Sequence, residues 1–183
     1  SVGRRSCRTV MNEVFNRLTA WLAPILCFTA EEAWQSRMTS HKESVHMRSY
    51  DEVPLKWHNA EIDEKWATIR QVRQVVMSAL EKARNEGAIG ASLQAAPVVY
   101  MTQAMQTTFV DQDVAGLFIT SDVSIVTTPP PAGAFRLDMV ADVAVEFVQA
   151  QGEKCARCWK VLPEVVLEGD ICIRCQNVVA SLG

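Results

Sequence analysis

Four cysteines near the end of the chain have the side-chain type and the spacing of metal ligands. Cys155 and Cys158 form one Cys-x-x-Cys pair, Cys172 and Cys175 form a second, and thirteen residues separate the pairs. Two residues between paired cysteines let one tight turn present both sulfurs to the same ion, and Zn²⁺ favours four thiolates in a tetrahedron. The sequence therefore predicts one zinc ion held within residues 151–183.

Two other chemistries use Cys-x-x-Cys pairs. A redox-active pair usually starts a helix after a strand and occurs once, so two facing pairs favour a metal. Iron accepts the same four thiolates and stays open as an alternative to zinc. Cysteine fills all four ligand positions, which leaves none for water or substrate. We therefore expect a structural metal, which replaces the hydrophobic core that so short a segment lacks.

Cationic side chains and one aromatic ring surround the cysteine pairs. Binding of single-stranded or looped RNA requires cations that meet phosphates beside a ring that stacks on a base. Acidic residues in the same segment dilute the positive charge. The alternative is that the ring packs over the metal site and the cations are solvated. The candidate RNA contacts of this segment are Lys154, Arg157, Trp159, Lys160 and Arg174.

Two helices are predicted at the start of the chain. Apolar residues recur at steps of three and four over residues 4–26, which indicates an amphipathic helix. Pro24 should end or kink this helix near Ala23. Thr29 and Glu32 have the spacing of a capping box, which predicts that a second helix begins at Thr29.

A long helix is predicted over residues 61–86, with Gly87 as its C-terminal cap. Arg70 and Arg73 lie about one turn apart on this helix and are candidates for bracketing an RNA phosphate, although an ordinary solvated face is the alternative. Arg73 is the weaker candidate because it falls at the edge of the apolar stripe. These helices together predict a helical bundle over residues 1–87.

Short strands are predicted after the bundle, where β-branched and aromatic residues cluster between turn residues. They span residues 97–101, 118–120, 123–126 and 143–149. The sequence thus predicts an α+β protein: a helical bundle, a small α/β unit over residues 88–150, and a four-cysteine zinc ribbon or knuckle over residues 151–183. The thirteen residues between the cysteine pairs are enough for a strand out and a strand back, with a turn at residues 168–170.

Composition limits the functions that this chain can have. The net charge of its 183 residues is −3, so any contact with nucleic acid must come from a local basic patch. No run of eighteen apolar residues is present, and we expect no membrane span. The unevenly placed cysteines do not suit a disulfide scaffold, which favours the reducing cytoplasm. His41, His46 and His58 have no recognisable nucleophile partner and are expected to be surface or packing residues.

Several segments resemble bacterial isoleucyl-tRNA synthetases. Residues 154–159, Lys-Cys-Ala-Arg-Cys-Trp, and 172–178, Cys-Ile-Arg-Cys-Gln-Asn-Val, resemble the C-terminal zinc-binding module of that family. Residues 22–34, Leu-Ala-Pro-Ile-Leu-Cys-Phe-Thr-Ala-Glu-Glu-Ala-Trp, resemble its anticodon-binding helical domain, although Cys27 stands where proline is common. Residues 44–47, Ser-Val-His-Met, and 90–95, Gly-Ala-Ser-Leu-Gln-Ala, follow in the order found in the family.

The resemblance implies a role in holding tRNA(Ile), on its anticodon stem-loop side, for an ATP-dependent isoleucine–tRNA ligase. Nothing in the sequence matches the His-Ile-Gly-His or Lys-Met-Ser-Lys-Ser signatures with which class I synthetases bind ATP, and the editing domain is missing. We therefore expect the C-terminal part of a cytoplasmic synthetase. Its partners would be tRNA and the upstream catalytic and editing domains, and it would be inactive alone.

Two further functions stay open. The same type of zinc finger ends formamidopyrimidine-DNA glycosylases, so a DNA-binding module is one alternative, although those enzymes lack the upstream helices. The other is a protein-interaction module in which the metal only staples the end of the chain. Preference for tRNA, for duplex or damaged DNA, or for no nucleic acid distinguishes the three functions.

Overall fold

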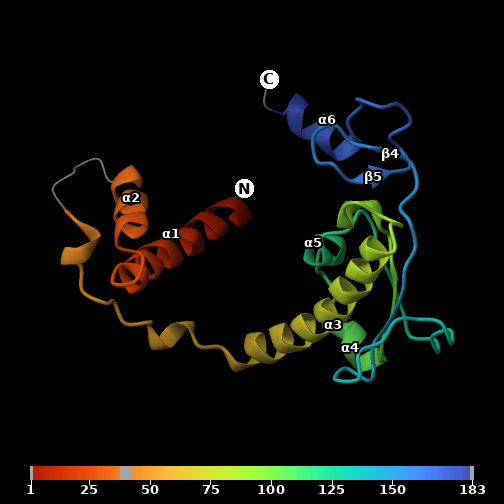
Figure 1. Ribbon diagram of the computed structural model, residues 1–183, viewed down its shortest axis with the longest axis horizontal. Helices are drawn as coiled ribbons and strands as arrows, with labels where there is room; N and C mark the ends of the chain where they lie inside the picture. The colour runs from red at the N-terminus through yellow and green to blue at the C-terminus, as the bar shows by residue number, and fades with distance from the viewer. Residues whose placement is uncertain (1, 38–42, 182–183) are drawn as a thin grey trace. The chain divides into compact units, whose positions relative to one another are not determined.

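Two compact units make up the chain in the computed structural model, which describes residues 2–37 and 43–181. Contacts group Ser1–His58 into the first unit and Asn59–Gly183 into the second (Figure 1). Helices dominate the first unit, and the second combines helices with two small sheets. The predicted α+β class is confirmed. No helix of the described residues has both the length and the apolarity that crossing a membrane requires.

The first unit begins with two helices, α1 (Val2–Leu22) and α2 (Cys27–Arg37). The predicted end of the first helix at Pro24 is confirmed. The predicted start of the second at Thr29 is wrong, because α2 already begins at Cys27 and the Ala30 N–H donates to the Leu26 carbonyl at 2.8 Å. The tight turn after Pro24 supplies the first helical carbonyl, so no side-chain cap at Thr29 is needed.

A small aromatic core joins these helices to the short helix η1 (Val45–Met47). The rings of Phe15 and Trp34 stack with centroids 6.2 Å apart. The Trp34 indole N–H donates to the Glu43 carbonyl at 2.9 Å, and the Arg48 guanidinium lies over that indole, 4.5 Å from the ring centre. This core holds the chain after α2 against both helices.

The Glu31 carboxylate fixes the entry into η1. It accepts hydrogen bonds from the Ser44 hydroxyl at 2.9 Å and from the Val45 N–H at 2.8 Å. The Gln35 amide also donates to it and, with the other two donors, holds the pKa of Glu31 below its ordinary value of 4.5 against the opposing effect of burial. An ionised carboxylate on α2 therefore holds the start of the short helix η1 in place.

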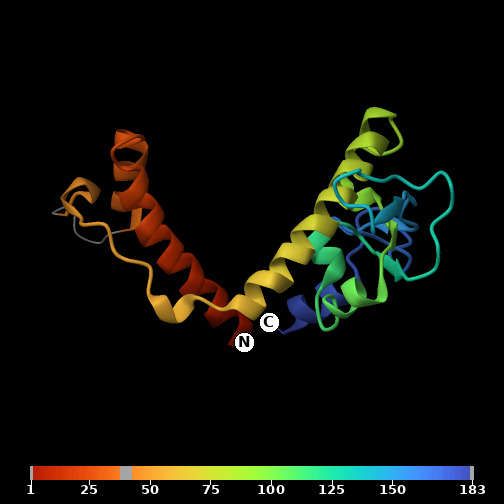
Figure 2. The ribbon, with the colours of Figure 1, turned by 90° about the horizontal axis from the view of Figure 1, so that it is seen from below.

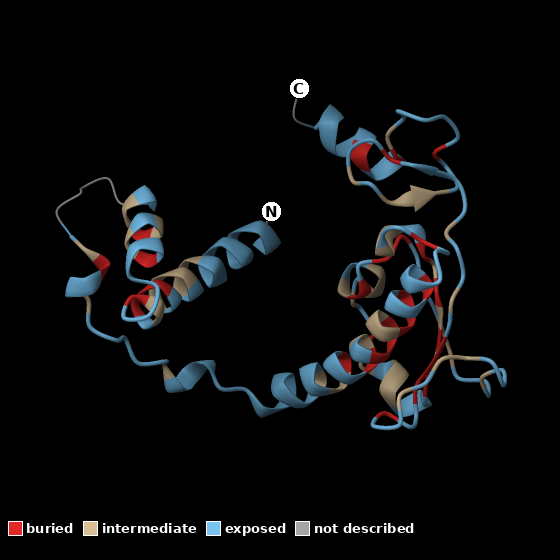
Figure 3. Cartoon of the chain, in the orientation of Figure 1, coloured by how far each residue is buried: buried red, intermediate tan, exposed pale blue. Residues whose placement is uncertain are grey.

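The apolar stripe of α1 faces away from α2. Phe15 packs in the core and Thr19 and Ala20 are buried, whereas five of the apolar residues that gave the helical pattern are 46% to 65% exposed. Figure 3 shows α1 mostly in the colour of exposed residues. The uncovered residues are Val10, Met11, Val14, Leu18 and Trp21.

The connection to the second unit contains the short helix η2 (Leu55–Trp57) and two of the three histidines. His46 and His58 are exposed, and the His46 Nε2 atom lies 3.2 Å from the Cys27 carbonyl oxygen. His41 lies outside the described residues.

The long helix α3 (Ala60–Asn85) confirms the prediction for residues 61–86. The Asn59 side chain caps its start by accepting from the Ile62 N–H at 3.0 Å, and Gly87 follows its end with φ of +77°. Its apolar stripe packs on the sheet and on α5, whereas the sequence had grouped it with the helices before it (Figure 2). The domain boundaries predicted from the sequence stay a prediction.

A three-stranded sheet packs against α3. Its strands β1 (Val98–Tyr100), β2 (Ser124–Val126) and β3 (Ala144–Glu146) lie in the order β2-β1-β3, with β1 parallel to β2 and antiparallel to β3. These strands confirm three of the four predicted ones. The remaining short helices are η3 (Ser92–Gln94), α4 (Gln103–Thr107) and α5 (Val114–Phe118).

The strand predicted at residues 118–120 is wrong. Phe118 ends α5, and Ile119 adopts the left-handed region with φ of +56°. The Asp113 carboxylate accepts from the Gly116 N–H at 3.0 Å, which starts a helix just before the residues of high β-propensity. Burial of Phe118 against Phe109 then holds the helix end in place.

Glu31→Gln should destabilise the Ser1–His58 unit at neutral pH and reduce its sensitivity to acid. Because the folded-state pKa lies below 4.5, the stabilisation is full above pH 4.5 and is lost as the pH falls through that lower value. Thermal unfolding followed through the indole N–H signal of Trp34 measures this. Glu32→Gln, at an exposed neighbour, is the control, and equal effects of both substitutions would contradict the prediction.

Candidate metal centre and nucleic-acid interface

The cysteine module begins with a short hairpin of β4 (Glu153–Lys154) and β5 (Val161–Leu162). The first cysteine pair lies in the turn between the strands. Within this turn the Cys155 N–H donates to the Lys160 carbonyl and the Trp159 N–H donates to the Cys155 carbonyl, both at 2.9 Å. The tight turn that the Cys-x-x-Cys spacing predicted is present.

The second cysteine pair opens the helix α6 (Ile173–Ala180), with Cys172 as its N-terminal cap residue. The sequence predicted a strand out and a strand back between the pairs, but in the described residues only β5 forms there. The predicted turn at residues 168–170 is confirmed, with φ of +94° at Gly169. A helix start replaces the return strand as the second support for the sulfurs.

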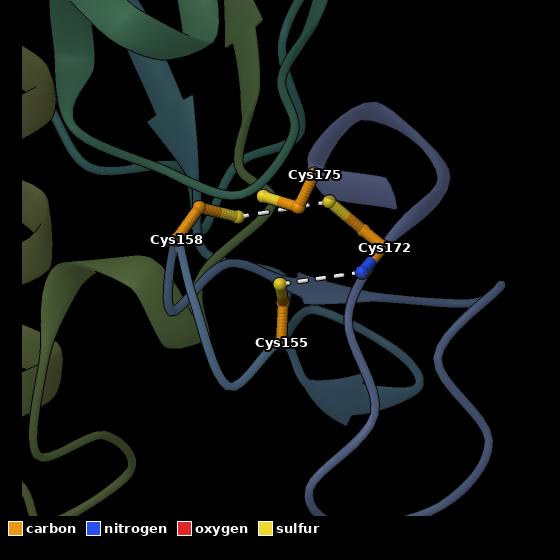
Figure 4. Close-up of side chains that lie close together, drawn as sticks. All are labelled: Cys155, Cys158, Cys172 and Cys175. Carbon is orange, nitrogen blue, oxygen red and sulfur yellow. Dashed lines mark hydrogen bonds between the residues drawn. The ribbon is translucent and has the colours of Figure 1, made fainter. Parts of the chain in front are cut away.

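The four cysteine sulfurs converge on one point. Their Sγ atoms all lie within 4.8 Å of one another, and those of Cys158 and Cys172 are 3.8 Å apart (Figure 4). Thiolates of a tetrahedral zinc site with Zn–S bonds of about 2.3 Å would be separated by about 3.8 Å. A disulfide is only about 2.05 Å long. The donor set and its spacing therefore fit a tetrahedral metal site.

Hydrogen bonds to sulfur favour the thiolate form that a metal needs. Burial alone would raise the pKa of Cys155. Hydrogen bonds from backbone N–H groups, including that of Cys172 at 3.3 Å from the sulfur, together outweigh burial and lower the pKa to about 6. At Cys175 burial again acts upward, and the Arg157 guanidinium, 3.8 Å from the sulfur, brings the pKa below its ordinary value. Burial dominates at Cys172 and raises its pKa to about 11.

The cysteines are also the core of the module. Cys155, Cys172 and Cys175 are buried together with Val165, and only a few half-buried side chains pack on them. No other buried cluster lies in the described part of residues 151–181. Bonds to a shared metal would therefore hold together what apolar contacts hold in a larger domain.

Ser121 joins the module to the sheet unit. Its hydroxyl donates to the Leu93 carbonyl at 2.5 Å and accepts from the Val161 N–H of β5 at 2.7 Å. The residue is buried although it is polar. No local pattern marks Ser121 in the sequence, because both of its partners are distant along the chain.

The predicted RNA contacts of the module lie around the sulfur cluster. The Lys154 ammonium is 5.5 Å from the centre of the Trp159 ring, and that ring is 61% exposed. Lys160 is half-buried. Arg157 donates to Cys175, and contacts with Cys158 and Cys175 raise the pKa of Arg174. Lys154 and Trp159 therefore present the free surface, whereas both arginines also serve the sulfurs.

Arg70 and Arg73 have different surroundings on α3. The Arg73 Nε atom donates to the Leu117 carbonyl at 2.9 Å and so holds the end of α5. Arg70 is exposed and lines an open groove along α3 with Arg73 and Glu81. Of this pair, Arg70 has the side chain that is available to a ligand.

Comparison with known proteins gives two family matches. Residues 1–100 match the family model of the anticodon-binding domain of tRNA ligase. Residues 152–178 match that of the zinc finger found in FPG and IleRS, which spans both cysteine pairs.

Individual isoleucine–tRNA ligases are similar to this chain over nearly its whole length. The isoleucine–tRNA ligase of Ruegeria pomeroyi is 45% identical over 98% of this chain, and that of Agrobacterium fabrum is 45% identical over 90%. The ligase of Brucella abortus is 42% identical over 90% of the chain. The chain spans only 17% to 19% of the length of these relatives.

Gly152→Ala should disrupt the β4–β5 hairpin. Gly152 has φ of +98°, and an added Cβ would overlap the Leu162 carbonyl on the partner strand. Gly169→Ala is the matched control: its φ is +94°, but a Cβ there meets nothing within 4 Å, so it should cost only about 1 kcal/mol. Hydrogen exchange of the hairpin N–H groups measures the difference, and equal protection in both variants would contradict this expectation.

Proposed function

Because the chain belongs to the anticodon-binding domain family of tRNA ligases, we propose that it binds tRNA(Ile) for an isoleucine–tRNA ligase. The observation that carries this proposal is the family match over residues 1–100, joined to relatives of that name along nearly the whole chain. Aminoacylation with ATP, and editing, would belong to the other four-fifths of such a ligase. This chain would contribute the hold on the anticodon stem-loop side of the tRNA, in the cytoplasm.

The domain division proposed here follows the sequence. Residues 1–87 would form the anticodon-binding part, residues 88–150 a junction and residues 151–183 the metal module. The family match over residues 1–100 supports including α3 in the first part, although α3 packs on the sheet. Because α3 lies within the family match but packs on the sheet, it would connect the anticodon-binding part to the junction.

Cys155, Cys158, Cys172 and Cys175 would hold one structural zinc ion. The zinc-finger match over residues 152–178 favours zinc over iron, which the thiolates alone do not distinguish. Zinc bound there would supply four coordinate bonds and no open position for substrate. Its effect on tRNA binding would therefore act through the shape of the module.

Trp159 is the proposed stacking residue of the module. The sequence left open whether this ring packs over the metal, but its exposure favours a ring presented to solvent. Its backbone has φ of +67°, an outlier for a bulky residue, which the bond from its N–H to the Cys155 carbonyl maintains. Backbone strain of this kind concentrates at functional sites. Lys154 beside the ring would meet a neighbouring phosphate.

The DNA-binding alternative has less support. The zinc-finger family includes FPG proteins by its printed description, but the match over residues 1–100 is to a tRNA ligase domain. The two matches agree only on the ligase.

Metal analysis of the purified chain should find one zinc ion per chain. Cys172→Ser should lower this ratio and should expose the N–H groups of residues 152–181 to hydrogen exchange, because the module has no other core. Cys27→Ser is the control, since Cys27 is an exposed free thiol in the first unit. Full zinc content in Cys172→Ser, or iron in the wild-type chain, would contradict the assignment.

The chain should bind tRNA(Ile) better than an unrelated duplex, with an affinity that falls as salt rises. Trp159→Ala should weaken binding by about tenfold, since stacking on one base contributes roughly 1–3 kcal/mol. Trp159→Phe keeps a ring and should restore most of the affinity. Fluorescence anisotropy with labelled tRNA measures this. Equal binding to tRNA and duplex would overturn the proposed function.

A further inference from the structure

One face of α1 changes character along its length. Residues spaced at three and four share a helix face, so Arg5, Arg8 and Asn12 lie on the face that Phe15 and Thr19 continue. Phe15 packs on Trp34 of α2, and α2 ends at Arg37, which contacts Asn12. Beyond that point the same face is polar and uncovered by α2. In the described structure, the part of this face that lies beyond the end of α2 is therefore exposed and carries arginines.

This exposed part of α1 and the end of α2 together line an open groove. Its volume is about 440 Å³, and the residues that line it are charged or polar: Arg5, Arg8, Thr9, Asn12 and Arg37. Arg37 is fixed there, because it donates to the Asn12 side-chain oxygen and its guanidinium lies 4.8 Å from the centre of the Phe15 ring. One of the three cations is therefore positioned before any ligand arrives.

The positive charge of the groove is not compensated nearby. Residues 1–12 contain three arginines and no acidic residue. Glu13, the first acid, is paired with Arg17 at 2.6 Å. Arg5 and Arg8 are exposed, and in the described structure neither side chain has a hydrogen bond or an ion pair. Arg5 and Arg8 thus concentrate positive charge at one place in a chain of net charge −3.

We infer that Arg5, Arg8 and Arg37 form a binding site for the sugar-phosphate backbone of RNA. Guanidinium groups fit phosphate oxygens bidentately, and the Asn12 side-chain NH2 group adds a neutral donor. The groove has no aromatic ring in its lining, so it would position RNA without reading its bases. This inference rests on the proposed function and adds to it a second contact region, in the first unit of the chain.

The test uses the full 183-residue chain with Arg5 and Arg8 both changed to Gln. Binding to tRNA(Ile) at low salt should weaken roughly tenfold, and the slope of log K against log salt should become shallower by about 1.5 to 2. The loss should be the same for an unrelated tRNA, because phosphate contacts carry no sequence information. Arg37 is left unchanged because it also contacts Phe15 and Asn12.

Two further variants make the result decisive. Lys56→Gln with Arg136→Gln removes the same charge from exposed positions outside the groove and should leave the affinity nearly unchanged. Arg5→Lys with Arg8→Lys keeps the charge without the fork and should bind with intermediate affinity. This pair also keeps the test valid if the glutamine variant melts at a lower temperature than the wild-type chain.

The outcomes separate the inference from the proposed function. The inferred role of the groove is wrong if the Arg5 and Arg8 glutamine variant binds with wild-type affinity, or if the Lys56 and Arg136 variant loses as much affinity. Either result is still compatible with the proposed binding of tRNA by the chain. Absence of tRNA binding by the wild-type chain overturns both. Binding of polyglutamate that depends on Arg5 and Arg8 and is stronger than RNA binding would assign the groove to an acidic protein segment instead.

Discussion

Convergence of four sulfurs is the constraint on which the cysteine module depends. Two strands of two residues each and one helix of eight residues cannot form a hydrophobic core. The cysteine side chains occupy the centre in its place, and N–H donors and Arg157 favour the thiolate form of Cys155 and Cys175. The exposed position of Trp159 follows from the same turn that aims Cys155 and Cys158 inward. The turn that directs two sulfurs toward the metal site therefore also exposes the Trp159 ring.

Single polar side chains join the irregular parts of both units to their regular elements. Glu31 ties η1 to α2, Arg73 ties the end of α5 to α3, and Ser121 ties β5 to the sheet unit. Each of them satisfies backbone groups that short helices and strands leave unpaired. Among the described residues, the largest apolar cluster lies between α3 and its sheet. The smaller parts depend on directed hydrogen bonds, which fix orientation as well as position.

Local signals in the sequence predicted what local physics decides. Pro24 and Gly87 mark the ends of α1 and α3, and β-branched runs mark β1 and β2. The cysteine spacing identified the sulfur cluster for the same reason. Residues 118–120 were misjudged because the cap at Asp113 outweighs the β-propensity of Phe118 and its neighbours. Ser121 and the arginine groove were missed, since their geometry arises from contacts between residues that are distant in the sequence.

Contacts of Arg157 and Arg174 with sulfur also settle the charge balance of the metal centre. Four thiolates around one divalent ion carry a net negative charge, and a polyanion such as RNA would be repelled by it. The two guanidinium groups lie against those sulfurs and offset that charge locally. These contacts would reduce the repulsion that a polyanion meets at such a centre, and Lys154 and Lys160 add further positive charge to the module.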